Sequence, residues 1–237
     1  RAMSGTIVDT ILQRYVPGDE FGVFYYRLPD EPHGHIFAIT EKRLAVVEGD
    51  GRRTLEQLVL DDDRAVAMAS LYCALNAARL EWVPPPGERV RLSELGVHSR
   101  GAIFLDGGAR QTPALSAAVD RIGGAVEGFC FGRFDVRADS AAAFSEGRFA
   151  VIELNGVTSE ATSIYDPKHS VIDAYRILFA QWRLAFAIGA VNRARGVPVT
   201  SLRALLAHWI AYRGVARGHL PTLPSRPSAV AGMLSTA

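Results

Sequence analysis

The sequence predicts an α+β fold with a largely antiparallel sheet flanked by helices. Short apolar or alternating segments follow one another with only turn residues between them, which is typical of neighbouring antiparallel strands. Longer segments with helical spacing come between and after these strands. The chain has 237 residues, 49% of them hydrophobic, which is enough to bury a core in one domain or in two closely packed subdomains.

Four strands are predicted in the first fifth of the chain. The apolar, β-branched segment 6–16 predicts a strand that ends at a Pro-Gly turn, and residues 21–28 predict a second strand directly after it. Alternation of apolar and polar residues then predicts two more strands, at residues 35–40 and 43–47.

Helices and short strands alternate in the middle of the chain. Thr54 is a typical N-cap for a helix over residues 55–60. The alanine-rich segment 65–80 has helical spacing and predicts a packed helix. The remaining elements here are two short strands and a helix, at residues 89–92, 102–106 and 112–122.

Two strands and two helices are predicted in the last part. The strands cover residues 128–136 and 148–154 and are joined by a polar, small-residue segment. The longest helix is predicted over residues 169–189, where apolar residues repeat every three to four positions. A last helix over 202–212 precedes a tail rich in Pro and Ser, which predicts a loose C-terminus.

Composition excludes several classes of function. The net charge is +1 with 22% charged residues, which argues against a nucleic-acid-binding tail or a polybasic membrane anchor. No apolar run approaches the ~20 residues that span a bilayer. Cys73 and Cys130 lack the spacing of a zinc site or disulfide framework, which fits a reducing compartment such as the cytoplasm. The chain opens with Arg1 and not Met, so a preceding segment in the natural protein stays open.

The residues most informative about chemistry lie on the strands predicted at 128–136 and 148–154. Glu153 and Asn155 are two positions apart, so their side chains project to the same face of a strand. If the two strands pair, Asp135 can lie opposite them. Two carboxylates and an amide oxygen are hard ligands that suit magnesium bridged to phosphates. Arg133 would share the face of Asp135, where a guanidinium can hold phosphate or oxyanion charge.

A solvated sheet face is the alternative interpretation of this pattern, and it would hold for an isolated E-x-N. The apolar residues around it favour a site, because unpaired carboxylates inside an apolar sheet are costly. The sequences GRFD at 132–135 and IELN at 152–155 resemble the metal-binding strands of ATP-grasp enzymes, the D-alanine ligases included. The resemblance implies an ATP-grasp catalytic subdomain that binds ATP and Mg²⁺. In it, Asp135, Glu153 and Asn155 hold the metal, and Arg133 contacts the reacting phosphoryl and acyl groups.

The segment QRYVPGDE at residues 13–20 resembles the interdomain hinge of the same family, although Pro-Gly-Asp-Glu alone is usually a turn. There, backbone groups bind adenine and an acidic residue binds the ribose hydroxyls. The resemblance assigns Glu20 to the ribose. It assigns four residues to the adenine pocket: Gln13, Arg14, Tyr15 and Val16.

Further positions are assigned with alternatives left open. Lys42 is a candidate for contact with the terminal phosphate, with a surface lysine as an equal alternative. Arg100 could neutralise a carboxylate substrate, although a surface arginine is the default interpretation. By resemblance, the polar loop 156–167 lines the acceptor side, which makes four residues candidate substrate contacts, although ordinary loop chemistry could explain each of them alone: Ser159, Glu160, Thr162 and Tyr165.

The resemblance implies an ATP-dependent ligase that joins a small-molecule carboxylate to an amine through an acyl phosphate. Residues 1–16 would be the last strand of the ATP-grasp lid and the hinge, 17–222 the catalytic subdomain, and 223–237 the loose tail. The chain then covers only about the second half of the fold. A nucleotide-binding or regulatory module without turnover remains an alternative, as does another ATP-grasp reaction such as carboxylation or a kinase-like phosphotransfer. A homodimer also stays open, and no nucleic-acid partner is expected.

Overall fold

The computed structural model of the chain describes residues 12–94, 96 and 101–219. These residues fall into two units. The larger is Tyr15–Arg195, and it contains every strand of the described chain. The second contains residues 12–14 and the residues from 196 onward, among them helix α6 (Leu202–His219). None of the helices in these described ranges is both long enough and apolar enough to cross a membrane.

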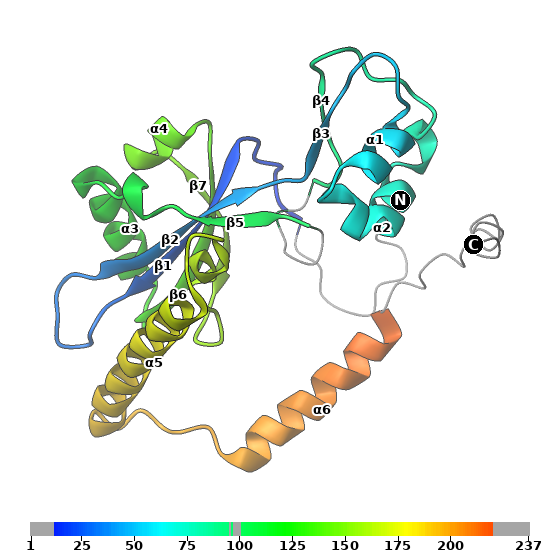
Figure 1. Ribbon diagram of the computed structural model, residues 1–237. Helices are drawn as coiled ribbons and strands as arrows, with labels where there is room; N and C mark the ends of the chain where they lie inside the picture. The colour runs from blue at the N-terminus through cyan, green and yellow to red at the C-terminus, as the bar shows by residue number, and fades with distance from the viewer. Residues whose placement is uncertain (1–11, 95, 97–100, 220–237) are drawn as a thin grey trace. The chain divides into compact units, whose positions relative to one another are not determined.

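Five strands of the larger unit form one sheet in the order β5-β2-β1-β6-β7 (Figure 1). Each neighbouring pair runs antiparallel. The strands are β1 (Asp19–Tyr26), β2 (His35–Arg43), β5 (Ile103–Asp106), β6 (Phe131–Ala138) and β7 (Ala150–Asn155). The predicted α+β class, with a largely antiparallel sheet flanked by helices, is therefore confirmed.

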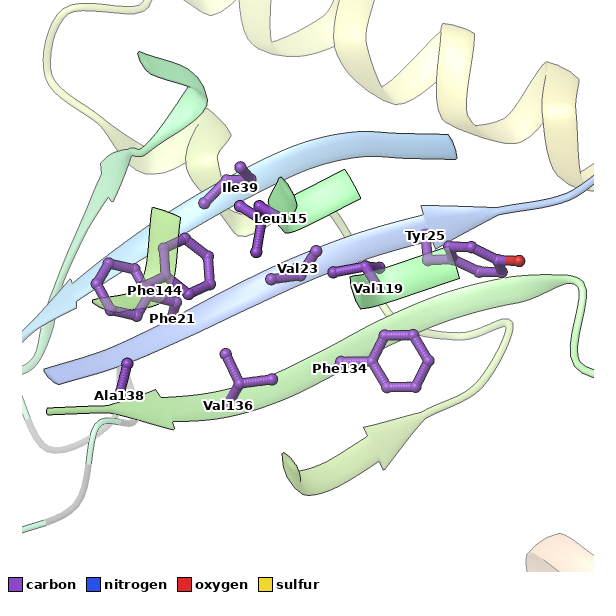
Figure 2. Close-up of a cluster of buried hydrophobic side chains, with 10 residues drawn as sticks. All are labelled: Phe21, Val23, Tyr25, Ile39, Leu115, Val119, Phe134, Val136, Ala138 and Phe144. Carbon is purple, nitrogen blue, oxygen red and sulfur yellow. The ribbon is translucent and has the colours of Figure 1, made fainter. Parts of the chain in front are cut away.

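One face of this sheet carries the apolar core. Alternate residues of β1 and β6 project to this face, where α3 (Pro113–Ala125) and α4 (Ala141–Ser145) cover them. Figure 2 shows the rings of Phe21 and Phe144 facing each other. They stack with centroids 3.9 Å apart and an interplanar angle of 3°. Helix α4 is not among the elements predicted from the sequence, although Ser140 caps it by accepting a bond from the amide of Ala143.

Helix α5 (Val171–Ala194) lies on the opposite face of the sheet. It begins at a capping box of Ser170 and Asp173, and the helix predicted over 169–189 is confirmed. Ile188 of α5 packs with Phe24 and Phe131 of the sheet. The outward side of the helix carries large apolar residues, among them Phe186 at 75% exposed.

A second, two-stranded sheet of β3 (Val46–Glu48) and β4 (Arg89–Arg91) has its own apolar core. Helix α1 (Leu55–Asp61) begins at Thr54 with a capping box, as the sequence predicted. The single packed helix predicted over residues 65–80 is wrong. The segment instead forms η1 (Ala65–Met68), α2 (Ala69–Leu75) and η2 (Ala77–Arg79). The cause is buried Asn76, whose Nδ2 donates to Tyr72 O and Leu92 O and ends α2 there.

The strand predicted over residues 6–16 is wrong where the structure describes it. Residues 12–16 have no strand geometry, and the Tyr15 side chain is 63% exposed. A strand needs a paired neighbour, and β-branched composition alone does not supply one. Residues 6–11 and the tail predicted at 223–237 lie outside the described residues.

The stacked rings of Phe21 and Phe144 predict that truncating one of them lowers the stability of the fold strongly. We expect Phe144→Ala to lower the free energy of unfolding by ~3–5 kcal/mol, because it leaves a cavity against Phe21. The matched control, Phe186→Ala on the exposed side of α5, should change it by less than ~0.5 kcal/mol. Urea denaturation measures both, and equal losses would contradict the assignment of Phe144 to the core.

Candidate active site

The face of the sheet opposite the α3–α4 core carries charged residues on three adjacent strands. Glu20 of β1 is registered between Lys42 of β2 and Arg137 of β6. Gly22, the next residue of β1 on this face, is registered against Asp135. Directly paired residues project to the same side of a sheet, so these side chains lie together.

The charged residues form one chain of contacts, which we call the charged network: Arg137, Glu20, Lys42, Asp135 and Arg133. Lys42 Nζ lies 2.8 Å from Glu20 Oε1 and 3.2 Å from Asp135 Oδ2. Arg137 Nη2 lies 2.9 Å from Glu20 Oε2, and Arg133 Nε lies 2.9 Å from Asp135 Oδ1. The Lys42 and Asp135 side chains are 5% and 8% exposed, so water screens this contact weakly. Three cations face two carboxylates in this network, and the carboxylate of Glu153, registered opposite Asp135, balances the third positive charge of this face.

Gly22 leaves room for this network over the middle of β1. A Cβ on Gly22 would come within 3.2 Å of Arg133 Cδ and 3.4 Å of Asp135 Oδ1. The first distance is tighter than most Cβ contacts, so with a side chain at this position Arg133 would have to shift by a few tenths of an ångström. The glycine therefore lets side chains of β6 lie over the neighbouring strand.

The three predicted metal ligands lie on this same face of adjacent strands. Asp135 is registered directly opposite Glu153, and Arg133 opposite Asn155. Asn155 Nδ2 lies 3.4 Å from Asp135 Oδ2. Glu153 is exposed, and within the described ranges no hydrogen bond or ion pair is found on its carboxylate. The i, i+2 spacing thus predicted the placement of these residues correctly.

The donor set fits magnesium in its chemistry, since all three residues offer hard oxygen atoms. No cluster of three His, Cys, Asp or Glu side chains that could hold a metal occurs among the residues described. A cation here would share Asp135 with Lys42 and Arg133.

The residues assigned to adenine are divided between the two units. Gln13 and Arg14 belong to the second unit and are exposed. Tyr15 and Val16 belong to the larger unit, and both contact Arg137. Its Nη1 donates to Val16 O at 2.9 Å, and its guanidinium carbon lies 5.5 Å from the centre of the Tyr15 ring.

The loop after β7 is fixed to the charged face by buried bonds. Gln181 of α5 is 1% exposed; its Oε1 accepts from Ala161 N at 2.8 Å and its Nε2 donates to Ser159 O at 3.1 Å. Thr162, in η5 (Thr162–Tyr165), is buried and donates its hydroxyl to Thr40 Oγ1 of β2 at 3.0 Å. This loop therefore has a defined position beside the network.

The four substrate-contact candidates of this loop differ in their surroundings. Tyr165 donates to Glu160 Oε1 at 2.6 Å, and this bond, together with partial burial, raises the pKa of Tyr165 to about 12. Arg133 Nη1 donates to Glu160 O at 3.2 Å, which ties the pair to the charged network. Ser159 donates its hydroxyl to Gly156 O within the turn, while Thr162 is enclosed. Arg100 lies outside the described residues.

A cleft of about 1100 Å³ adjoins the Glu20 end of the charged network. Glu20, Lys42 and Arg137 line one side of it, next to Tyr15. The other side comes from the smaller sheet and its helices, including Met68, Tyr72, Arg89 and Arg91. The network thus borders a space large enough for a small molecule.

Sequence reasoning missed two residues that organise this site. Arg137 continues the i, i+2 series of Arg133 and Asp135, and that series could have identified it. Gln181 had no signal, because its role depends on how α5 packs against the loop.

A second polar cluster, around Asp106, also went unpredicted. Asp106 Oδ2 lies 3.0 Å from Lys168 Nζ and 3.3 Å from His169 Nε2. Burial would raise the pKa of Asp106, but hydrogen bonds from the Gly108 amide and from Lys168 outweigh it and lower that pKa. Lys168 thus pairs with the end of β5.

Comparison with known proteins gives a partial likeness to solved structures. No protein-family model matches the chain, and no curated protein does. Among solved structures, a bifunctional glutathione synthetase from Pasteurella multocida is similar, with a TM-score of 0.44 and 17% sequence identity. The similarity covers 71% of this chain and 24% of that one, so this chain spans about a quarter of the length of that protein.

The burial of the charged network predicts that Asp135 is important for stability. We expect Asp135→Ala to lower the free energy of unfolding by ~3–5 kcal/mol, because Lys42 and Arg133 would lose their shared carboxylate. As a control, Asp61→Ala removes an exposed carboxylate paired with Arg53 at 2.9 Å and should cost less than ~1 kcal/mol. Denaturant titration of both variants is the measurement; a loss for Asp135→Ala no larger than the control's would mean that the network is screened by water.

Proposed function

We propose that this chain is the catalytic part of an ATP-grasp ligase that joins a carboxylate to an amine at the expense of ATP. One observation carries the proposal. Asp135, Glu153 and Asn155 share one sheet face with three cationic side chains, those of Lys42, Arg133 and Arg137. Hard oxygen ligands beside cationic donors are what a magnesium-bound polyphosphate requires.

The nucleotide would lie along this face from residue 15 toward β7. Glu20 accepts from Lys42 with Oε1 and from both Nε and Nη2 of Arg137 with Oε2, so the lone pair that Oε1 keeps would accept from a ribose hydroxyl. Asp135, Glu153 and Asn155 would hold Mg²⁺, which neutralises phosphate charge when bound. The 1100 Å³ cleft beside Glu20 has room for the nucleoside end.

The reaction needs no nucleophile from the protein. A substrate carboxylate oxygen attacks the γ-phosphorus, the bond to the β-phosphate oxygen breaks, and ADP leaves. The amine nitrogen then attacks the acyl carbon, loses a proton, and inorganic phosphate departs as the tetrahedral intermediate collapses. Arg133 donates from Nε and Nη2 to the carboxylate of Asp135 and from Nη1 to Glu160 O. These bonds fix the guanidinium, and its two remaining N–H groups are available to stabilise the negative charge that develops during transfer.

A nucleotide-binding module without turnover is the second candidate, and one observation favours it. Lys42, the residue assigned to the terminal phosphate, is held by two carboxylates at 2.8 and 3.2 Å. In that geometry two of its three N–H donors serve the sheet, which leaves at most one for a phosphate. The two candidates differ in whether ADP is released.

Substrate-dependent ADP release tests the proposed function. We expect the full-length protein, with Mg²⁺ and ATP, to release ADP only when a suitable carboxylate and amine are both supplied from a substrate panel. Chelation of Mg²⁺ should abolish the release, because the phosphates would lose their counter-charge. Tight ATP binding without ADP release from any pair would favour the binding module, and absence of ATP binding would reject both.

Arg133 should affect the chemistry more than the binding of ATP. We expect Arg133→Met to lower kcat by roughly 10²-fold or more, since its charge stabilises groups that become negative during transfer. Affinity for ATP, measured by calorimetry, should change much less. Arg148→Met is the matched control, because Arg148 is exposed and pairs only with Glu146 in the described structure. Full kcat in the Arg133→Met variant would reject its assigned role.

A further inference from the structure

We propose that Arg137 is a positioning residue for the nucleotide, which acts by holding residues 15–20 against the sheet. It would determine the affinity for ATP without taking part in phosphoryl or acyl transfer. This inference rests on the proposed function and adds a residue that the sequence resemblance did not assign.

Arg137 contacts both ends of the segment. Its Nε and Nη2 lie 3.2 and 2.9 Å from Glu20 Oε2. Its Nη1 donates to Val16 O at 2.9 Å, and its guanidinium lies beside the Tyr15 ring. The Arg137 side chain is only 12% exposed, so these bonds are shielded from water. A planar guanidinium with fixed donors can join two acceptors in one geometry, which a lysine cannot reproduce.

The segment depends on such contacts because strand pairing does not hold its first part. Residues 12–17 have no strand geometry, and β1 begins only at Asp19. Gly18 has a φ of +111°, and a Cβ there would come within 2.1 Å of Ala138 O, so the backbone crosses the end of β6 closely. Arg137, next to Ala138 on that strand, then fixes the carbonyl of Val16 on one side of the crossing and the carboxylate of Glu20 on the other.

Removal of Arg137 should therefore weaken nucleotide binding in particular. The proposed adenine contact at Val16 and ribose contact at Glu20 would no longer be held at a fixed separation, and ordering them would cost binding free energy. Arg137 is four residues from Arg133 along β6, which places their Cα atoms ~13 Å apart. Three of the Arg137 donors are directed at Glu20 and at Val16 O, on the nucleoside side, whereas Arg133 donates to Asp135 of the proposed metal site.

Two measurements on the full-length protein test this proposal. Hydrogen–deuterium exchange without nucleotide reports on the amides of residues 15–20, and calorimetry with kinetics reports ATP affinity and kcat. We expect Arg137→Met to speed exchange in this segment, to raise the Kd for ATP about 10-fold or more, and to leave kcat at saturating ATP within about 3-fold. Arg137→Lys should recover part of the affinity. Arg148→Met, an exposed arginine, should match the parent in every readout.

Several results would overturn the proposal. Unchanged exchange in residues 15–20 would show that Arg137 does not hold the segment. Faster exchange with unchanged ATP affinity would show that the segment's position does not matter for the nucleotide. A fall in kcat as large as that of Arg133→Met would assign Arg137 to the chemistry. A parent protein that binds no ATP rejects the proposed function itself, whereas an ATP-binding parent with an unaffected Arg137→Met variant rejects only this inference.

Discussion

Lys42 lies between the carboxylates of Glu20 and Asp135, and this ammonium links three strands of the sheet on one face. An ammonium and two carboxylates that are largely removed from water are stable only when each has its partners. The contacts require the observed register, because a shift of one residue would turn these side chains to the apolar face. The geometry of the candidate site therefore depends directly on the register of β2, β1 and β6.

The two faces of the sheet have different roles, since one carries the main apolar core and the other carries the candidate site. On one face, the stacked rings of Phe21 and Phe144 and the residues around them bury apolar surface, which is the main source of stability. The other face carries the charged network beside the apolar contacts of α5 with Phe24 and Phe131, and the rigid strands hold these charges in place. Gly22 lies on this second face, and because it has no side chain, Arg133 and Asp135 can lie over β1.

The candidate site also depends on elements that are distant in the chain. Gln181, on α5, satisfies two backbone groups of the loop that follows β7, and Thr40 of β2 accepts from Thr162 in the same loop. Arg133 then reaches the loop through the carbonyl of Glu160. Positioning the guanidinium of Arg133 thus requires the sheet, the loop and the buried side of α5 together.

The sequence by itself determined the local features of this protein. The two-residue period of a strand follows from covalent geometry, so the common face of Glu153 and Asn155 was predictable, as were most strands and the cap at Thr54. Tertiary structure decided what depends on partners: the break of the predicted helix at Asn76, the loss of the predicted strand at residues 12–16, and the contacts of Arg137. The two-residue period predicts to which face of a strand a side chain projects. The pairing register of the strands decides which charged residue lies opposite it, and that register is set by packing across the whole sheet.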